Sequence, residues 1–120
     1  MHNYKELEIW KSSLKYCTLI YKLTAKFPEE EKFGLISQLR RAAVSVPSNI
    51  AEGSAKSSDR HFVVFPENSF GSCREIDTQL LVAIELRFIN QEDASGTLSE
   101  LYRIMVMLNN FITKLKSNLK

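Results

Sequence analysis

Apolar residues recur at spacings of three and four along most of the chain, which is how a helix displays one face. The first stripe, within about residues 4–25, consists of Leu7, Trp10, Leu14, Cys17, Tyr21 and Thr24. A second stripe begins at Leu35 and continues through Leu39, Ala42 and Val46 within about residues 35–53. A third lies within about residues 59–89, and the most regular one covers residues 98–119. The pattern predicts four amphipathic helices.

The segments between these stripes are short and rich in turn-forming residues. "KFPEEEKFG" turns the chain after the first helix, Ser58 is placed to cap the third, and "NQEDASG" forms the last turn or a loosely wound start of the fourth. The chain has only four glycines and three prolines, and no run of residues has the pattern of a strand. We therefore expect an all-α fold, an up-down-up-down four-helix bundle formed by residues 1–120 as one domain.

Two prolines interrupt this regular picture. Pro47 lies inside the second helix, where it cannot donate a hydrogen bond to the carbonyl of Ala43, so we expect a kink there. Ser45, Ser48 and Asn49 are the nearest side chains able to satisfy the freed backbone groups. Pro66 predicts a second kink, or a later start of regular helix, in the third helix.

The second helix also carries more apolar surface than a monomeric bundle needs. Val44 and Ala51 fall on the side opposite the core stripe. Either Pro47 rotates the two halves of the helix, or the back of the helix meets another subunit; we expect both a kink and an oligomer contact. The residues assigned to this structural motif and contact are Ser45, Pro47, Asn49, Ile50, Glu52 and Gly53.

Composition and charge place the chain among ordinary globular proteins. Hydrophobic residues make up 44% and charged residues 25%, and the net charge of +2 does not by itself indicate a nucleic-acid partner. No apolar run is long enough to span a bilayer, and the first residues lack the apolar core of a signal peptide. We expect a cytoplasmic protein with no membrane partner, whose two cysteines stay reduced.

Catalytic and metal-binding chemistry is not indicated. The two histidines, His2 and His61, have no glutamate three residues before them, and the expected core stripes carry no carboxylates, so no metal site is predicted. Cys17 and Cys73 fall on core-facing positions, where a thiol behaves as a small, inert hydrophobe. There is no glycine-rich phosphate loop. We expect no catalytic residue, cofactor or small-molecule substrate.

Basic residues form two groups that are candidates for binding nucleic acid. The first is Arg40, Arg41, Lys56 and Arg60, and the second is Lys114, Lys116 and Lys120. Arg40 and Arg41 project to opposite flanks of the core stripe. They have three possible roles: contacting phosphates, pairing with Glu52 or with glutamates of a neighbour, and solvating the helix.

The stretch "GLISQLRRAAVSVPSNIAEG" resembles the signature of the small bacterial proteins encoded by intervening sequences within 23S ribosomal RNA genes. That signature is similar to G-L-x-x-Q-h-R-R-A-A-x-S-x-P-x-N-I-A-E-G, with h apolar. Upstream, "LEIWKSS" and "IYKLTAKFPEEEKFG" resemble the family's first helix and turn, and downstream "GSCREIDTQLLVA" resembles its third-helix segment. The resemblance covers nearly the whole chain.

The resemblance implies a four-helix bundle that assembles as a ring, a homopentamer, with no enzymatic activity. A related group, the accessory proteins of diversity-generating retroelements, engages nucleic acid through a basic pentameric barrel. By analogy we expect a non-catalytic homo-oligomer that binds structured RNA or DNA through its basic residues; the alternative is a protein-interaction adaptor with no nucleic-acid role. Val64 and Pro66 depart from the family's third helix, and five copies would carry only about +10 in total, which weakens a basic groove.

Overall fold

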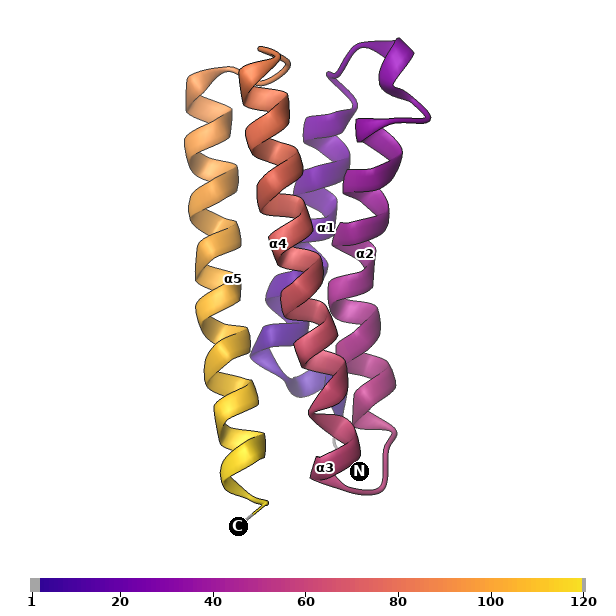
Figure 1. The fold of residues 1–120 in the computed structure, drawn as a ribbon, viewed down its shortest axis with the longest axis vertical. Helices are drawn as coiled ribbons and strands as arrows, with labels where there is room; N and C mark the ends of the chain where they lie inside the picture. The colour runs from indigo at the N-terminus through magenta and orange to yellow at the C-terminus, as the bar shows by residue number, and fades with distance from the viewer. Residues whose placement is uncertain (1–2, 120) are drawn as a thin grey trace.

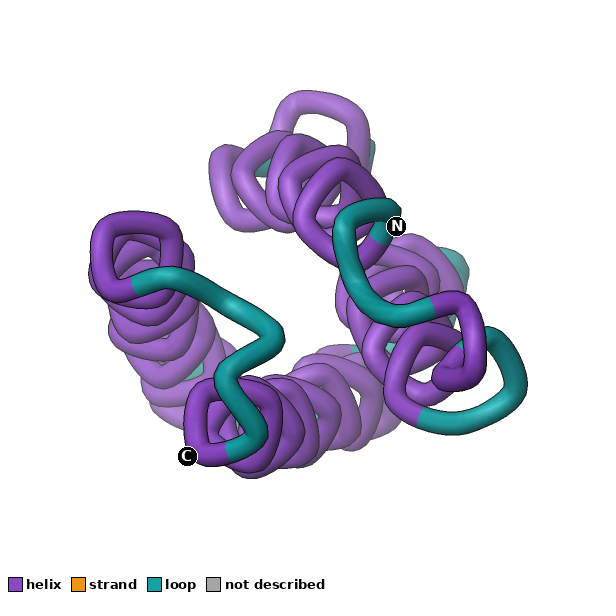
Figure 2. The backbone as a smooth tube through the Cα atoms, turned by 90° about the horizontal axis from the view of Figure 1, so that it is seen from above, coloured by secondary structure: helices purple, strands orange, loops and turns teal. Residues whose placement is uncertain are grey.

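Four long helices form the body of the protein in a computed structural model that describes residues 3–119. They are α1 (Glu8–Thr24), α2 (Leu35–Ser54), α4 (Val64–Glu85) and α5 (Gln91–Ser117) (Figure 1). The short elements are the 3₁₀ turns η1 (Tyr4–Glu6) and η2 (Glu29–Glu31) and the single turn α3 (Asp59–Phe62). The long helices run alternately up and down around a shared core, as Figure 2 shows from above. The expected all-α four-helix bundle is therefore confirmed.

The first helix differs from the expectation in its start and in its buried face. Leu7 is extended and separates η1 from α1, so regular helix begins at Glu8 and not near residue 4. The residues that α1 buries are Ile9, Ser13, Tyr16, Ile20, Leu23 and Thr24. Leu14, expected in the core, is 47% exposed, and Tyr21 is 43% exposed. The helix carries two apolar stripes side by side. The core is formed mainly by the one that the periodicity did not single out, while Leu7, Trp10 and Cys17 of the predicted stripe pack against its edge.

The turn between the last two helices is tighter than expected. Instead of reaching residue 89, α4 ends at Glu85, and Arg87 adopts a left-handed conformation with φ of 63°. The Phe88 amide then donates to the Ala83 carbonyl and the Arg87 amide to the Ile84 carbonyl, each at 2.9 Å. This is a Schellman ending, which satisfies carbonyls that the helix end leaves free.

The segment "NQEDASG" is regular helix and not a loose start, so that expectation is wrong. Helix α5 begins at Gln91, directly after Asn90. The side-chain oxygen of Asn90 accepts a hydrogen bond from the Asp93 amide at 2.8 Å. This N-cap satisfies one of the free amides of the first turn and so fixes where the helix starts.

The two prolines affect their helices differently. The expected third helix is divided at Val63 into α3 and α4, and Pro66 lies in the first turn of α4, where its missing amide hydrogen breaks no helical bond. In contrast, α2 continues through Pro47 without interruption, and the kink expected there stays a prediction. The Ser58 hydroxyl accepts from the His61 amide at 3.4 Å, which confirms the predicted cap of α3.

A second, smaller hydrophobic cluster lies at the lower end of the bundle in Figure 1, where the carboxyl ends of α2 and α5 meet α3. Phe62 and Val63 pack there with Ile112 and Leu115, and a Phe62–Phe111 ring pair lies beside them. A Cβ on Gly53 would lie 2.7 Å from Phe65 Cβ, so only glycine allows this close approach.

No helix among residues 3–119 is long and apolar enough to cross a membrane.

Candidate functional site

Pro47 lies on α2, which has one groove on its α1 side and another on its α4 side. Backbone carbonyls near Pro47 accept hydrogen bonds from both of these neighbouring helices. The Ala43 carbonyl, which has no helical donor because residue 47 is proline, accepts a hydrogen bond from the Cys17 thiol of α1 at 3.1 Å. On the other side the Ser69 hydroxyl of α4 donates to the Val46 carbonyl at 2.8 Å. For the Ala43 carbonyl, the sequence indicated partners within α2 only. Residue spacing could not reveal Cys17 because it belongs to another helix.

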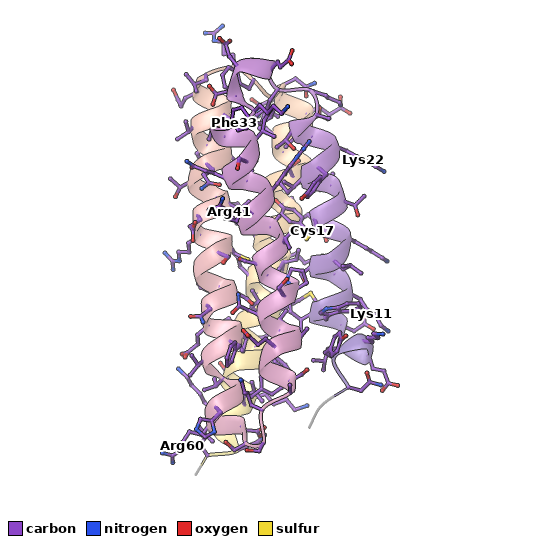
Figure 3. All side chains as sticks on the ribbon, turned by 90° about the vertical axis from the view of Figure 1, so that its right-hand side faces the viewer. Lys11, Cys17, Lys22, Phe33, Arg41 and Arg60 are labelled. Atoms are coloured by element: carbon purple, nitrogen blue, oxygen red, sulfur yellow. The ribbon has the colours of Figure 1, made fainter. Side chains whose placement is uncertain are left out.

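The first groove lies between α1 and α2 and is apolar. It has a volume of about 310 Å³, and its walls include Tyr4, Trp10, Leu14, Val44, Pro47 and Ala51. None of the described residues that line it is charged. Leu14 is 47% exposed and Val44 42% exposed, although both border a seam between two packed helices. In Figure 3 Cys17 marks this seam. The groove contains the back of α2 that the sequence assigned to an oligomer contact.

The other residues of the predicted motif lie elsewhere. Ile50 is fully buried, and Gly53 packs against Phe62 and Phe65. Neither residue is therefore accessible to another subunit. Glu52 is exposed on the surface of α2. Ser45 and Asn49 belong to the opposite groove of the helix. Of the six motif positions, Pro47 is the one that lines the apolar groove.

The second groove lies between α2 and α4 and is polar. Its volume is about 340 Å³, and its lining includes Gln38, Arg41, Asn49, Ser72, Glu75 and Gln79. The floor is held by internal bonds: the Ser45 hydroxyl donates to the Ala42 carbonyl at 2.9 Å and is hydrogen-bonded to the Ser72 hydroxyl. The Asn49 amide donates to the Ser45 carbonyl at 2.8 Å. Sequence reasoning missed this groove, because its residues come from two helices whose register only the fold sets.

Arg40 and Arg41, adjacent in sequence, have different environments. The Arg40 guanidinium donates to Thr24 Oγ1 at 2.9 Å and to the Tyr21 carbonyl at 3.2 Å, and it stacks over the Tyr21 ring at 4.6 Å. It therefore fastens the carboxyl end of α1, where a cation is favourable. Arg41 is exposed at the polar groove (Figure 3) and makes no ion pair or side-chain hydrogen bond within residues 3–119.

The remaining basic candidates lie toward the lower end of the bundle. Lys56 lies 5.0 Å from the centre of the Phe65 ring, and Arg60 is exposed on α3 (Figure 3). Lys116 is paired with Glu67 at 3.0 Å, and Lys114 is exposed beside it on α5. Lys120, like His2, lies outside the described residues. The basic side chains are thus distributed over several elements and do not form one patch with Arg41.

Both thiols are protonated at neutral pH. Burial raises the pKa of Cys73 to about 12, and burial also raises the pKa of Cys17 to about 11. Cys73 lies in the core as expected, whereas Cys17 is only partly buried because it borders the apolar groove. Among residues 3–119 no three His, Cys, Asp or Glu side chains gather where they could hold a metal ion.

Comparison with known proteins identifies relatives of this arrangement. The family model described as 23S rRNA-intervening sequence protein matches residues 5–110. A crystal structure from Bacteroides thetaiotaomicron, of a protein with unknown function from the S23 ribosomal protein family, superposes with a TM-score of 0.78. The two chains are 21% identical, and the match covers 87% of this chain and 97% of the other, so it shows the shared fold. No curated protein matches the sequence.

Proposed function

This chain belongs to the 23S rRNA-intervening sequence protein family, and we propose that it is a non-catalytic homo-oligomer that binds RNA or DNA. Self-assembly is the part that the geometry supports best. The observation that supports it is the apolar groove between α1 and α2, which leaves Leu14 and Val44 half exposed and has no charged residue among the described residues of its lining. A surface of this kind gains free energy when another subunit removes it from water.

The number of subunits proposed is five, the number that the family resemblance implies. A ring of five requires head-to-tail contacts, in which the apolar groove of one copy meets a different face of the next copy. The small residues of α2 support such an arrangement. Ala51 and Ser48 line the groove and allow the backbone of a neighbour to approach closely.

The proposed assembly is tested by light scattering on nuclease-treated protein. We expect a pentameric mass for the wild type and a smaller mass for Val44→Glu, because burying an unpaired carboxylate in an apolar contact is costly. Val82→Glu is the matched control, since Val82 is 43% exposed on α4, outside the groove. Circular dichroism verifies that each variant is folded. A monomeric wild type, or equal effects of the two substitutions, would contradict the assignment.

The nucleic-acid part of the proposal rests on Arg41. Within residues 3–119 its guanidinium is exposed and unpaired at the polar groove, in contrast to Arg40, which donates to Thr24 and Tyr21 of the same subunit. Lys56, which follows α2, and Arg60 of α3 would be separate contacts at the carboxyl end of α2, apart from Arg41. One subunit offers few cations to the phosphates of a nucleic acid. The affinity would therefore depend on several subunits binding the same molecule together.

Binding is measured with a structured RNA at several salt concentrations. We expect affinity to fall as salt rises, and Arg41→Gln to weaken binding and to reduce the salt slope by about one unit. Arg87→Gln is the control, because Arg87 lies in the turn after α4. Absence of salt-dependent binding would contradict this part, and a nuclease-insensitive protein partner that co-purifies consistently would favour the adaptor alternative.

A further inference from the structure

The polar groove between α2 and α4 has the features of a binding site for a small polar group. Its volume of about 340 Å³ lies at the lower end of the range of ligand pockets. Arg41 and Gln38 come from α2, and Glu75 and Gln79 come from α4. The antiparallel packing of the two helices brings a cation, a carboxylate and two amides to one site.

The floor of the groove is already satisfied, whereas the groups around it are not. The Ser45 and Ser72 hydroxyls bond to each other, and the Asn49 amide bonds to the Ser45 carbonyl. Within residues 3–119 neither Arg41 nor Glu75 makes an ion pair or a side-chain hydrogen bond. Gln79 Oε1 is buried and also lacks a partner, although its amide nitrogen reaches Gln38 Oε1 at 3.4 Å. A buried acceptor without a donor is unfavourable unless another molecule supplies one.

Helix α4 also has an open surface beside this groove. A second depression of about 320 Å³ shares Glu75 and Gln79 with the first and is formed around Gly71. A Cβ on Gly71 would meet no atom within 4 Å, so packing inside the subunit does not require glycine there. Glycine in a helix interior is nevertheless unfavourable compared with alanine. The open surface at Gly71 lets another molecule approach the backbone of α4 directly.

These groups define what a ligand must present. It needs acceptors for the Arg41 guanidinium and at least two donors, for the Glu75 carboxylate and Gln79 Oε1. Guanine meets this requirement, since O6 and N7 accept a bidentate bond from arginine while N1–H and the N2 amino group donate. Adenine and cytosine each carry one amino group beside a ring acceptor, so they lack two adjacent donor groups, and uracil has a single ring N–H. Unpaired bases are the form in which proteins reach these edges.

We propose that the α2–α4 groove binds an unpaired guanine base, with Glu75 and Gln79 Oε1 accepting from its N–H groups and Arg41 donating to its acceptors. This inference rests on the proposed nucleic-acid role when the base belongs to an RNA strand; Arg41 then donates to the base where a guanine occupies the groove and to a phosphate where none does. A free guanine nucleotide would present the same edge to the same residues. The experiment therefore has one arm for each source of the base.

The RNA arm uses two fluorescent nine-nucleotide strands, one of uridines alone and one with a central guanosine. We expect fluorescence anisotropy to show about ten-fold tighter binding of the guanosine strand. Glu75→Gln should abolish that preference, so that this variant binds the two strands with equal affinity. Glu85→Gln is the matched control, because Glu85 is exposed on the same helix outside the groove. It should keep the preference.

The nucleotide arm titrates GMP, AMP, CMP and UMP separately and follows the backbone amide signals by NMR. We expect GMP alone to shift the signals of Ser45, Ser72 and Glu75. Equal affinity for both strands together with no selective effect of GMP would overturn the guanine site but leave the nucleic-acid role intact. Loss of binding to every RNA would contradict the proposed function, and a GMP-specific response would then still support the site. A smaller oligomer mass for Glu75→Gln than for Glu85→Gln would overturn the proposal by showing a subunit interface.

Discussion

The two sides of α2 are built from one stretch of sequence but have opposite chemistry. Toward α1 the helix presents Val44, Pro47 and Ala51 to a groove whose lining, within residues 3–119, carries no charge. Toward α4 it presents Arg41 and Asn49 to a groove with a cation, a carboxylate and amides. The "RRAAVSVPSNIAEG" stretch is therefore not a single site. Its alternating residue types assign one face to an apolar contact and the other to a polar one.

The comparison also explains how the helix tolerates Pro47. The carbonyl that the proline leaves without a donor is Ala43 O, and the Cys17 thiol reaches it from the α1 side. From the α4 side the Ser69 hydroxyl bonds to the Val46 carbonyl, one residue before the proline. Each seam thus contributes one donor to the same turn. A proline inside a helix is tolerated where neighbouring side chains satisfy the freed groups.

The largest expected effect concerns the close packing of Gly53, near the carboxyl end of α2, against Phe62 and Phe65. Gly53→Ala should destabilise the protein by about 2 kcal/mol, because the new methyl group would overlap Phe65 and Phe62. Gly71→Ala, in open space on α4, should instead stabilise it by roughly 0.5–1 kcal/mol. Urea unfolding of both variants gives the two free energies. If Gly53→Ala were as stable as the wild type, the aromatic side chains would not constrain this end of α2.

A smaller effect should distinguish the two donors near Pro47, the Cys17 thiol and the Ser69 hydroxyl. Cys17→Ala should destabilise the protein by about 1 kcal/mol, since the Ala43 carbonyl then has no donor. In the Pro47→Ala background this cost should shrink, because residue 47 regains an amide hydrogen for the same carbonyl. The measurement is a double-mutant cycle by urea unfolding.

Ser69→Ala is the control for this cycle. The Val46 carbonyl is also within reach of the helical amide of Ile50, so removing the Ser69 hydroxyl should cost about 1 kcal/mol in either background. If the losses of unfolding free energy caused by Cys17→Ala and Pro47→Ala were additive, the Cys17 thiol would not stabilise the protein by bonding to the Ala43 carbonyl.

Sequence periodicity was sufficient for the number and type of helices, but not for the choice between neighbouring apolar stripes. In α1 the stripe through Leu14 and the stripe through Tyr16 are both apolar, and hydrophobicity alone does not say which one the core covers. Packing decided it, since the Tyr16 hydroxyl is buried and donates to the Thr97 carbonyl at 2.9 Å. The rejected stripe became one wall of the apolar groove.

The candidate sites were less predictable than the fold for a related reason. The sequence indicated Arg41, Ser45 and Asn49, but Glu75 and Gln79 lie more than 25 residues away on another helix. Their convergence depends on the register between α2 and α4, which no local pattern contains. Similarly, Arg40 could not be distinguished from Arg41 until Thr24 and the end of α1 were placed beside it.

The smallest expected effect compares the Cys17 thiol, which borders the apolar groove, with the Cys73 thiol in the core. Burial raises the pKa of Cys17 to about 11 and that of Cys73 to about 12, above the ordinary value of about 8.5 for a free thiol. Folding therefore favours the neutral thiol, so this contribution to stability is complete below about pH 8.5 and is lost as the pH rises toward those values. Tyr16 titrates in the same direction because burial raises its pKa as well.

Comparing Cys73→Ala with the wild type at pH 7.5 and 9.5 isolates the thiol from Tyr16. The variant should lose less stability between these two pH values, in urea unfolding, than the wild type does. Labelling of the native protein with a thiol reagent at pH 8 should also modify Cys17 before Cys73, because Cys17 borders the open groove. If Cys73 were modified first, the core around α4 would open more readily than the apolar groove admits the reagent, and the greater accessibility assigned to Cys17 would be wrong.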